Sequence, residues 1–283
     1  MEKLGPFVRA AAPACAVLLI FVACLATLAG YSFRPRLGMA QMGSGFTLES
    51  YAAFFRDPFN LAYLWRSLWI ATYTTAVVLV LGYVVAYHMT VCGPRMRLII
   101  TIILLVQFFT SYVIRTYAIV LALGRYGIVN NGLIALGVIS VPAKLLFTEF
   151  AVAAGLVLVA VPFMVFPVYG SIAGISPNLR AAAGSLGATP AAVFREIVLP
   201  LSLPGVAAGV VIVYLFNLTA FITPSLLGGG HVDMIANLIF DRAMNTQDYP
   251  FASAAAMVSL LLTLIIVYLL QSGFRRTIRG AER

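Results

Sequence analysis

Long apolar stretches follow one another along this chain, separated by shorter segments that hold most of the charges. A helix needs roughly 20 apolar residues to cross a hydrocarbon core of about 30 Å. Stretches of that length run over about 11–30, 67–89, 98–123, 148–169, 204–223 and 251–271. The pattern predicts an all-α polytopic membrane protein in which residues 1–283 form a single transmembrane domain of six helices.

Composition also indicates that lipid surrounds most of the chain. Hydrophobic residues make up 62% of the 283 residues and charged residues only 10%, which is outside the range of soluble proteins. The two histidines and three cysteines show no spacing typical of a metal site. The net charge of +9 is carried by Lys and Arg scattered around the apolar stretches, which favours a role in membrane orientation over nucleic-acid binding.

The charges that flank the apolar stretches predict that both termini lie in the cytoplasm. With six spans, ten Lys and Arg then fall on the inner side and seven on the outer side, and Arg115 falls inside a span. This bias has the direction of the positive-inside rule. The first stretch could instead be a secretory signal cleaved near Ala29, although it is longer than the roughly 7–15-residue core of such signals.

The predicted cytoplasmic loop between the fourth and fifth spans, residues 171–203, has the pattern of two short helices. Ser176–Pro177 and Thr189–Pro190 each place a hydroxyl that can cap free amides before a proline that fits the first helical position. Gly187, between them, suits the left-handed residue that ends a helix. We therefore expect two short helices that meet at a bend.

The second of these helices is expected to end before Pro200 and Pro204, since proline interrupts helical hydrogen bonding. An apolar surface that could insert into a groove of another protein is expected from Leu186, Val193, Phe194 and Ile197. The alternative is an amphipathic loop that lies on the membrane.

The same loop resembles the EAA loop of permeases in ABC importers, whose pattern is EAA-x3-G-x9-I-x-L-P. In that family the loop contains the coupling helix, which sits in a cleft of the ATP-binding subunit. The resemblance implies that the contact with the ATPase uses Arg180, Ala181, Ala182, Gly187, Ala188, Ile197, Leu199 and Pro200. The family's Glu is replaced here by Ala181, so docking is expected to depend on shape and apolar contact, with Arg180, Arg195 and Glu196 as the charged candidates.

Most of the chain resembles the spermidine/putrescine permease group of type I ABC importers. The similar segments are FTLESYAAFFRDP, TSYVIRTYA, GIVNNGLIALG, LLFTEFAVAAGLVLVAVPFMVFPVY and the LGGG after the fifth span. The resemblance implies a bacterial inner-membrane permease that pairs with a second permease, two ATPase subunits and a periplasmic binding protein. The chain has no G-x-x-x-x-G-K-[ST] motif, so we expect it to bind no cofactor and to leave ATP and Mg²⁺ to the partner ATPase.

The solute follows less directly from the sequence. A polyamine leaving water needs carboxylates or aromatic faces. Relatives in this group often read GEF-x-x-P-E-L-L-G-G after the fifth span, whereas this chain has Ala220 and Ser225 in place of the two acids. A polyamine is the first expectation, and an opine, an amino-acid derivative or another small polar solute is the alternative.

Polar residues inside the spans are candidates for the translocation path. Gln107, Ser111 and Arg115 recur every four residues and would share one helical face, and Tyr214 and Asn217 are three residues apart on the fifth span. Each set also has a structural interpretation: Arg115 could pair with Glu149 or cap carbonyls, and the other pair could form interhelical hydrogen bonds.

Two other classes of protein are less consistent with the sequence. An intramembrane enzyme would need a motif such as G-x-S-x-G or H-E-x-x-H, and neither occurs in a span. A secondary transporter would normally show more spans or an internal repeat. The chain is therefore expected to be a non-catalytic permease.

Overall fold

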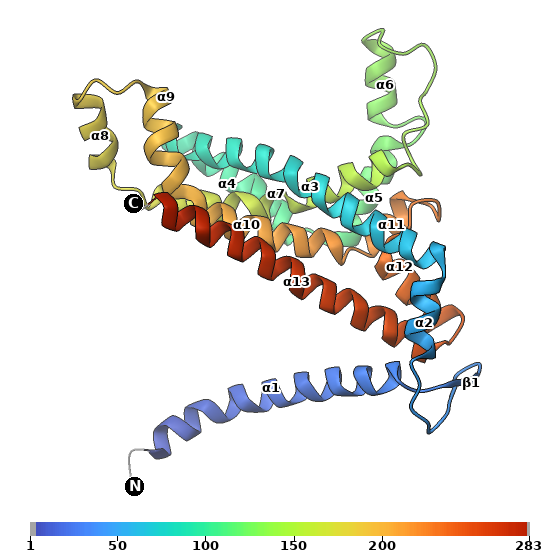
Figure 1. Cartoon of the computed structure of the whole chain (residues 1–283). Coiled ribbons are helices and arrows are strands. Elements are labelled where there is room, and N and C mark those ends of the chain that lie inside the picture. The colour runs from blue at the N-terminus through green and yellow to red at the C-terminus, as the bar shows by residue number, and fades with distance from the viewer. Residues whose placement is uncertain (1–3, 282–283) are drawn as a thin grey trace. The chain divides into compact units, whose positions relative to one another are not determined.

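The computed structural model describes residues 4–281, with side chains described for 15–179 and 181–275. Almost all of its regular structure is helical (Figure 1). In chain order, the helices are α1 (Leu4–Ser32), α2 (Glu49–Arg56), α3 (Pro58–Val91), α4 (Pro94–Phe109), α5 (Tyr112–Leu123), α6 (Ile128–Ala135), α7 (Glu149–Ala173), α8 (Pro177–Ser185), α9 (Pro190–Val193), α10 (Leu199–Leu218), α11 (Ile222–Leu227), α12 (Ile235–Phe240) and α13 (Tyr249–Ala281). The remaining elements are the π-helical turns η1 (Phe194–Val198) and η2 (Asp241–Asn245) and the antiparallel strands β1 (Arg36–Gly38) and β2 (Gln41–Met42).

Six helical stretches of the described residues are long and apolar enough to cross a membrane, which confirms the predicted number of spans. They are Cys15–Ser32, Pro58–Val91, Tyr112–Ala135, Glu149–Ala173, Pro190–Leu218 and Tyr249–Arg275. The second begins well before residue 67, so Trp65 and Trp69 lie inside α3 and both are exposed.

The helix expected over 98–123 is interrupted in its middle. α4 ends at Phe109, Thr110 and Ser111 are extended, and α5 begins at Tyr112. The Arg115 guanidinium donates from Nη2 to the Thr110 carbonyl, 2.7 Å away, and so satisfies an acceptor that the break leaves free. The prediction of one continuous helix here was wrong.

The helix expected to end before Pro200 instead continues through it. Over η1 the backbone widens, and the Leu199 N–H reaches the carbonyl of Phe194, five residues back. Pro200 then takes an early position of α10, where its missing N–H costs little. Helical structure therefore runs from Pro190 to Leu218, with Pro204 also inside it.

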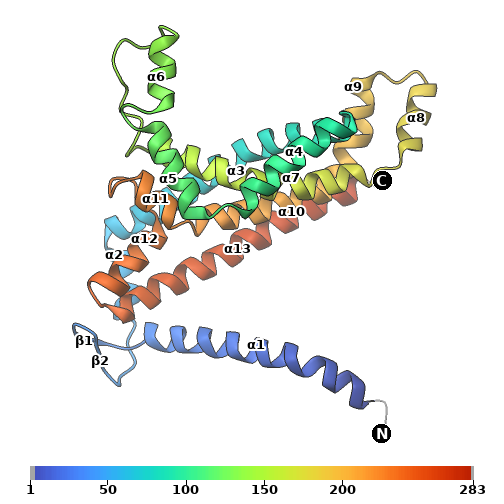
Figure 2. The ribbon, with the colours of Figure 1, turned by 180° about the vertical axis from the view of Figure 1, so that it is seen from behind.

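The chain forms two compact units: Met1–Tyr63 with Leu238–Leu262, and Leu64–Asn237 with Thr263–Arg283. The core of the second unit is built on α7 and α10, which lie side by side (Figure 2). Their close approach depends on small residues, because a Cβ atom added to Gly205 would lie 2.5 Å from the Pro167 carbonyl oxygen.

In the first unit, the loop after α1 is tied to the start of α13. Arg36 forms an ion pair with Asp248 at 2.7 Å, and Asp248 also accepts a hydrogen bond from the Phe251 N–H, 3.2 Å away. The Phe251 ring contacts the buried ring of Phe54 and, on its face, the Arg242 guanidinium. Two segments that are far apart in the sequence thus pack together within the first unit.

Candidate functional site

The loop between α7 and α10 consists of two short helices that meet at a glycine. α8 ends at Ser185, and Gly187 has a φ of +81°, the left-handed conformation expected of it. Thr189 caps α9, accepting from the Ala192 N–H at 3.3 Å. Ser176 makes no side-chain cap, so the predicted hydroxyl cap is confirmed at Thr189 and wrong at Ser176.

The apolar residues of this loop do not form a single surface. Leu186, at the bend, is 88% exposed. Phe194 turns the other way and makes edge contacts with Tyr83 and Tyr87 of α3, with ring centroids 5.9 and 5.1 Å apart. The expected docking surface is therefore divided: Leu186 is free to contact a partner, whereas Phe194 fixes the loop to the helical bundle.

The predicted coupling residues lie on α8, at the bend after it, on η1 and at the start of α10. Those on and just after α8 are mainly exposed: Ala181, Ala182 and Gly187 are exposed and Ala188 is half-buried. The later ones lie nearer the core, with Ile197 and Pro200 half-buried and Leu199 exposed. The side chain of Arg180 lies outside the described residues, whereas Arg195 and Glu196 are exposed.

A pocket of about 300 Å³ lies where two apolar segments are interrupted, between the start of α5 and the junction of α10 with α11. The Tyr112 hydroxyl is hydrogen-bonded to the Thr223 hydroxyl at 2.6 Å. Phe216, Thr219 and Ala220 line the same pocket. Interrupted membrane helices place backbone carbonyls and amides where a polar solute can reach them.

Aromatic rings continue from this pocket across α4, α7 and α10. Tyr112 contacts Phe216, Phe216 stacks on Phe163, and Phe163 contacts Phe108, with ring centroids 5.9, 5.1 and 5.2 Å apart. We call Tyr112, Phe216, Phe163 and Phe108 the aromatic row. Sequence analysis missed it because the four rings come from four separate helices.

The three polar residues expected on one face of the third span do not share a face, because the chain breaks between them. Gln107 donates to the carbonyl of Leu158 on α7, and Ser111 precedes the first residue of α5. Arg115 caps α4, as the structural interpretation proposed, and its Nε is buried without a partner among the described residues. The alternative ion pair with Glu149 is not found among the described residues.

The two polar residues of the fifth span face α3 and α13. The Asn217 Nδ2 donates to the Thr74 hydroxyl at 2.9 Å, and both residues are buried. Tyr214 packs with Ala71 and Leu218. The contact of Asn217 is the interhelical hydrogen bond that was the alternative to a role in the path.

Comparison with known proteins places the chain in a family. Residues 8–280 match the family described as binding-protein-dependent transport system inner membrane component. The chain therefore belongs to this family: it is a permease subunit of an ABC importer, a multi-pass protein of the inner membrane, and ATP hydrolysis is not its own activity.

Curated relatives cover most of the chain. The spermidine/putrescine transport system permease protein PotB of Haemophilus influenzae is 34% identical over 239 residues, 84% of this chain and 83% of the relative. PotB of Escherichia coli is 35% identical over 250 residues, 88% of this chain and 89% of the relative. The inner membrane ABC transporter permease protein YdcU of Escherichia coli is 30% identical over 235 residues, 79% of this chain and 74% of the relative.

Solved structures share the fold. A chain of a bacterial ABC transporter that imports the acidic polysaccharide alginate superposes with a TM-score of 0.79 at 20% identity, covering 97% of this chain and 99% of that chain. A chain of the inward-facing MetNI methionine ABC transporter gives a TM-score of 0.58 at 19% identity, covering 79% of this chain and 96% of that chain. The shared architecture thus occurs in importers of chemically different solutes.

Proposed function

We propose that this permease carries a polyamine across the inner membrane and that the aromatic row forms part of its route. The relatives named as spermidine/putrescine permeases, similar over more than four fifths of the chain, carry this proposal. The aromatic row supports it, because it supplies π faces where the acids expected near Ala220 and Ser225 are missing.

The cost of moving an ammonium group into the membrane and the gain from an aromatic face are of similar size. Placing a charged group in the centre of a membrane helix costs about 2.5–3.5 kcal/mol on insertion scales. A desolvated cation over an aromatic face gains about 2 kcal/mol. One ring per ammonium group therefore offsets most of the cost without a carboxylate.

Uptake of labelled spermidine by the whole importer tests this route. Phe216→Leu keeps an apolar side chain but removes the π face, and we expect spermidine uptake to fall about tenfold. Phe150→Leu is the matched control, because Phe150 is 60% exposed and lies outside the aromatic row. Equal uptake by the two variants would show that the aromatic row is not part of the translocation route.

Competition between solutes tests the polyamine itself. Spermidine and putrescine should outcompete neutral and zwitterionic solutes, both in uptake and in binding to the periplasmic protein. Preferred uptake of a zwitterion that is lost in Arg115→Ala would instead assign the opine or amino-acid class, with the buried Nε of Arg115 meeting a carboxylate.

We further propose that α8 and the bend at Gly187 dock onto the ATPase, as part of a complex with two ATPase subunits that use ATP and Mg²⁺, a second permease and a periplasmic binding protein. The exposed Leu186 and the small residues of α8 give the loop a shape that can enter a cleft. Gly187→Val forces a β-branched residue into left-handed backbone.

This variant should abolish uptake and uncouple ATP hydrolysis, while the permease remains in the membrane. Gly184→Val is the control, because a Cβ at Gly184 meets nothing within 4 Å and its φ is not positive. Normal coupling in Gly187→Val would contradict the docking role.

The proposed orientation puts both termini and the coupling loop in the cytoplasm. Single cysteines at Gln41 and Gly230 should react with an impermeant reagent from the periplasm, and those at Gly187 and Gly280 should not. The native Cys15, Cys24 and Cys92 are first replaced by serine. Labelling of the last two positions from outside would reverse the topology.

A further inference from the structure

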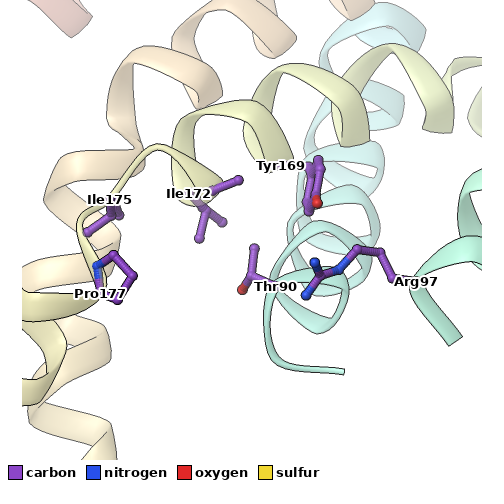
Figure 3. A pocket seen from close by; sticks show the side chains of 7 residues that line it. Thr90, Arg97, Tyr169, Ile172, Ile175 and Pro177 are labelled. Atoms are coloured by element: carbon purple, nitrogen blue, oxygen red, sulfur yellow. The ribbon is translucent and has the colours of Figure 1, made fainter. Parts of the chain in front are cut away.

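A second pocket lies at the other end of the same unit, beside the turn from α3 to α4. Its volume is about 510 Å³. Thr90, Arg97 and Tyr169 line one side, and Ile172, Ile175 and Pro177 line the other (Figure 3). Neither the aromatic row nor the exposed tip of the coupling loop belongs to it.

We propose that this pocket binds the phosphate of an anionic phospholipid. Arg97 is held at the pocket by two hydrogen bonds to the end of α3: Nε donates to the Met89 carbonyl at 2.8 Å and Nη2 to the Cys92 carbonyl at 3.4 Å. Its Nη1 has no hydrogen-bond partner among the described residues. A guanidinium fixed in this way is already oriented for an anion, and phosphate is one of the two anions, with carboxylate, whose geometry matches the planar fork of arginine.

Tyr169 supplies a second donor to the same space. Its ring comes from α7 and points toward Arg97 and Thr90 (Figure 3). The Thr90 hydroxyl donates to the Tyr87 carbonyl at 2.8 Å, so its proton is already used. An anion in the pocket would therefore accept from Arg97 and Tyr169, whereas a cation would find no carboxylate among the lining residues.

The surroundings of Arg97 favour a lipid over a free phosphate ion. The residues that follow it on α4 are large, apolar and exposed: Leu98 is 60%, Ile99 52% and Ile102 50% exposed. Acyl chains can lie along this face while the headgroup enters the pocket. Basic pockets between membrane helices at the cytoplasmic interface are where acidic headgroups bind.

Pro177, the first residue of α8, lines this pocket too. A bound headgroup would therefore contact both the α3–α4 turn and the start of the coupling loop. An effect of lipid on coupling rests on the proposed function of that loop, and the cytoplasmic position of the pocket rests on the proposed orientation. The contacts of Arg97 and Tyr169 with a phosphate rest on neither.

Native mass spectrometry of the full-length permease in detergent tests the site. We expect one phosphatidylglycerol to be retained more tightly than phosphatidylcholine of the same chain length. Arg97→Gln should weaken that retention about tenfold, as expected for loss of a hydrogen bond from a charged group. Arg95→Gln, an exposed neighbour that loses the same charge, should leave it unchanged. Equal retention by the Arg97 and Arg95 variants would overturn the proposal.

Two further measurements separate loss of lipid binding from loss of structure. Arg97→Gln also removes two caps of α3, so Tyr169→Phe, which removes only a hydroxyl, provides the second test, with an expected loss of about fivefold. Unchanged retention in Tyr169→Phe would contradict the site. Inorganic phosphate is titrated separately: if it displaces phosphatidylglycerol at millimolar concentration, the pocket takes a free anion and the lipid assignment fails.

Discussion

The α4–α5 joint and the helix from α9 through α10 both lack regular backbone hydrogen bonds at one point, and they compensate in opposite ways. At the joint the helix stops, and a side chain takes up the free carbonyl, since Arg115 donates to Thr110. In the α9–α10 helix the backbone itself compensates, through the wide turn in which the Leu199 N–H reaches Phe194. The first solution leaves a bend beside a pocket, and the second leaves a continuous helix.

This difference assigns separate mechanical roles to the two regions. Helical structure from Pro190 to Leu218 covers 29 residues, or about 43 Å at 1.5 Å per residue. It begins in the proposed coupling loop and ends beside the pocket lined by Phe216 and Thr219. We expect a displacement of α9 to move the pocket end of α10 by a similar amount, because the helix between them is continuous. We expect bending to occur at the α4–α5 joint instead.

The largest effect is expected where the continuous helix meets α7. Gly205→Val places a Cβ 2.5 Å from the Pro167 carbonyl oxygen and from the Ser171 Cβ, so the backbones must separate. Overpacking usually lowers the free energy of unfolding by about 1–3 kcal/mol. The loss should be larger here, because the clashing carbonyl oxygen belongs to the backbone and cannot move aside as a side chain can. Thermal unfolding in detergent should show loss of the folded permease. Gly170→Val on α7 meets nothing within 4 Å and should keep the native melting temperature.

The joint should be more tolerant, because a single side chain supports it. Arg115→Gln removes the hydrogen bond to the Thr110 carbonyl and leaves that carbonyl unpaired, which costs about 1–3 kcal/mol. The melting temperature should fall by several degrees. The exposed Arg125 provides the control, and Arg125→Gln should not change it. Identical melting of the two variants would mean that the break needs no support from Arg115.

A smaller effect is expected at the start of the continuous helix. Thr189→Ala removes the cap on the Ala192 N–H, which costs about 1 kcal/mol. Ser176→Ala removes a hydroxyl that caps nothing, and we expect its unfolding free energy to match the wild type. Hydrogen exchange of the α8 and α9 amides distinguishes the two variants. Faster exchange after Ser176→Ala would contradict the assignment of Ser176 as a residue whose hydroxyl caps nothing.

The smallest effect is expected at the proline. Since η1 already accommodates Pro200, Pro200→Ala should change the melting temperature little, with a cost or gain below about 0.5 kcal/mol. Uptake by the complex should also persist. A large loss of stability would show that the proline, and not the wide turn, holds this part of the helix in place.

The sequence predicts most strongly where one physical demand dominates. Lipid requires long apolar helices, so six spans could be counted, and left-handed backbone favours glycine, so the conformation of Gly187 could be anticipated. The break at Thr110 and Ser111 carries no proline or glycine signal, and the hydrogen bond from Arg115 to the Thr110 carbonyl is a tertiary detail that the sequence pattern does not encode. The aromatic row depends on which faces of α7 and α10 meet, and the spacing of Phe163 and Phe216 along the chain does not encode that.

The ion pair between Arg36 and Asp248 constrains how the protein is made. The two residues are 212 positions apart, so during synthesis the loop after α1 waits until nearly the whole chain has left the ribosome before its acidic partner exists. A chain that stops before the last span leaves Arg36 without its carboxylate and Phe54 without the Phe251 ring. This unit is therefore completed only after the start of α13 has been synthesised, so the helices between α3 and α12 can pack before the first unit closes.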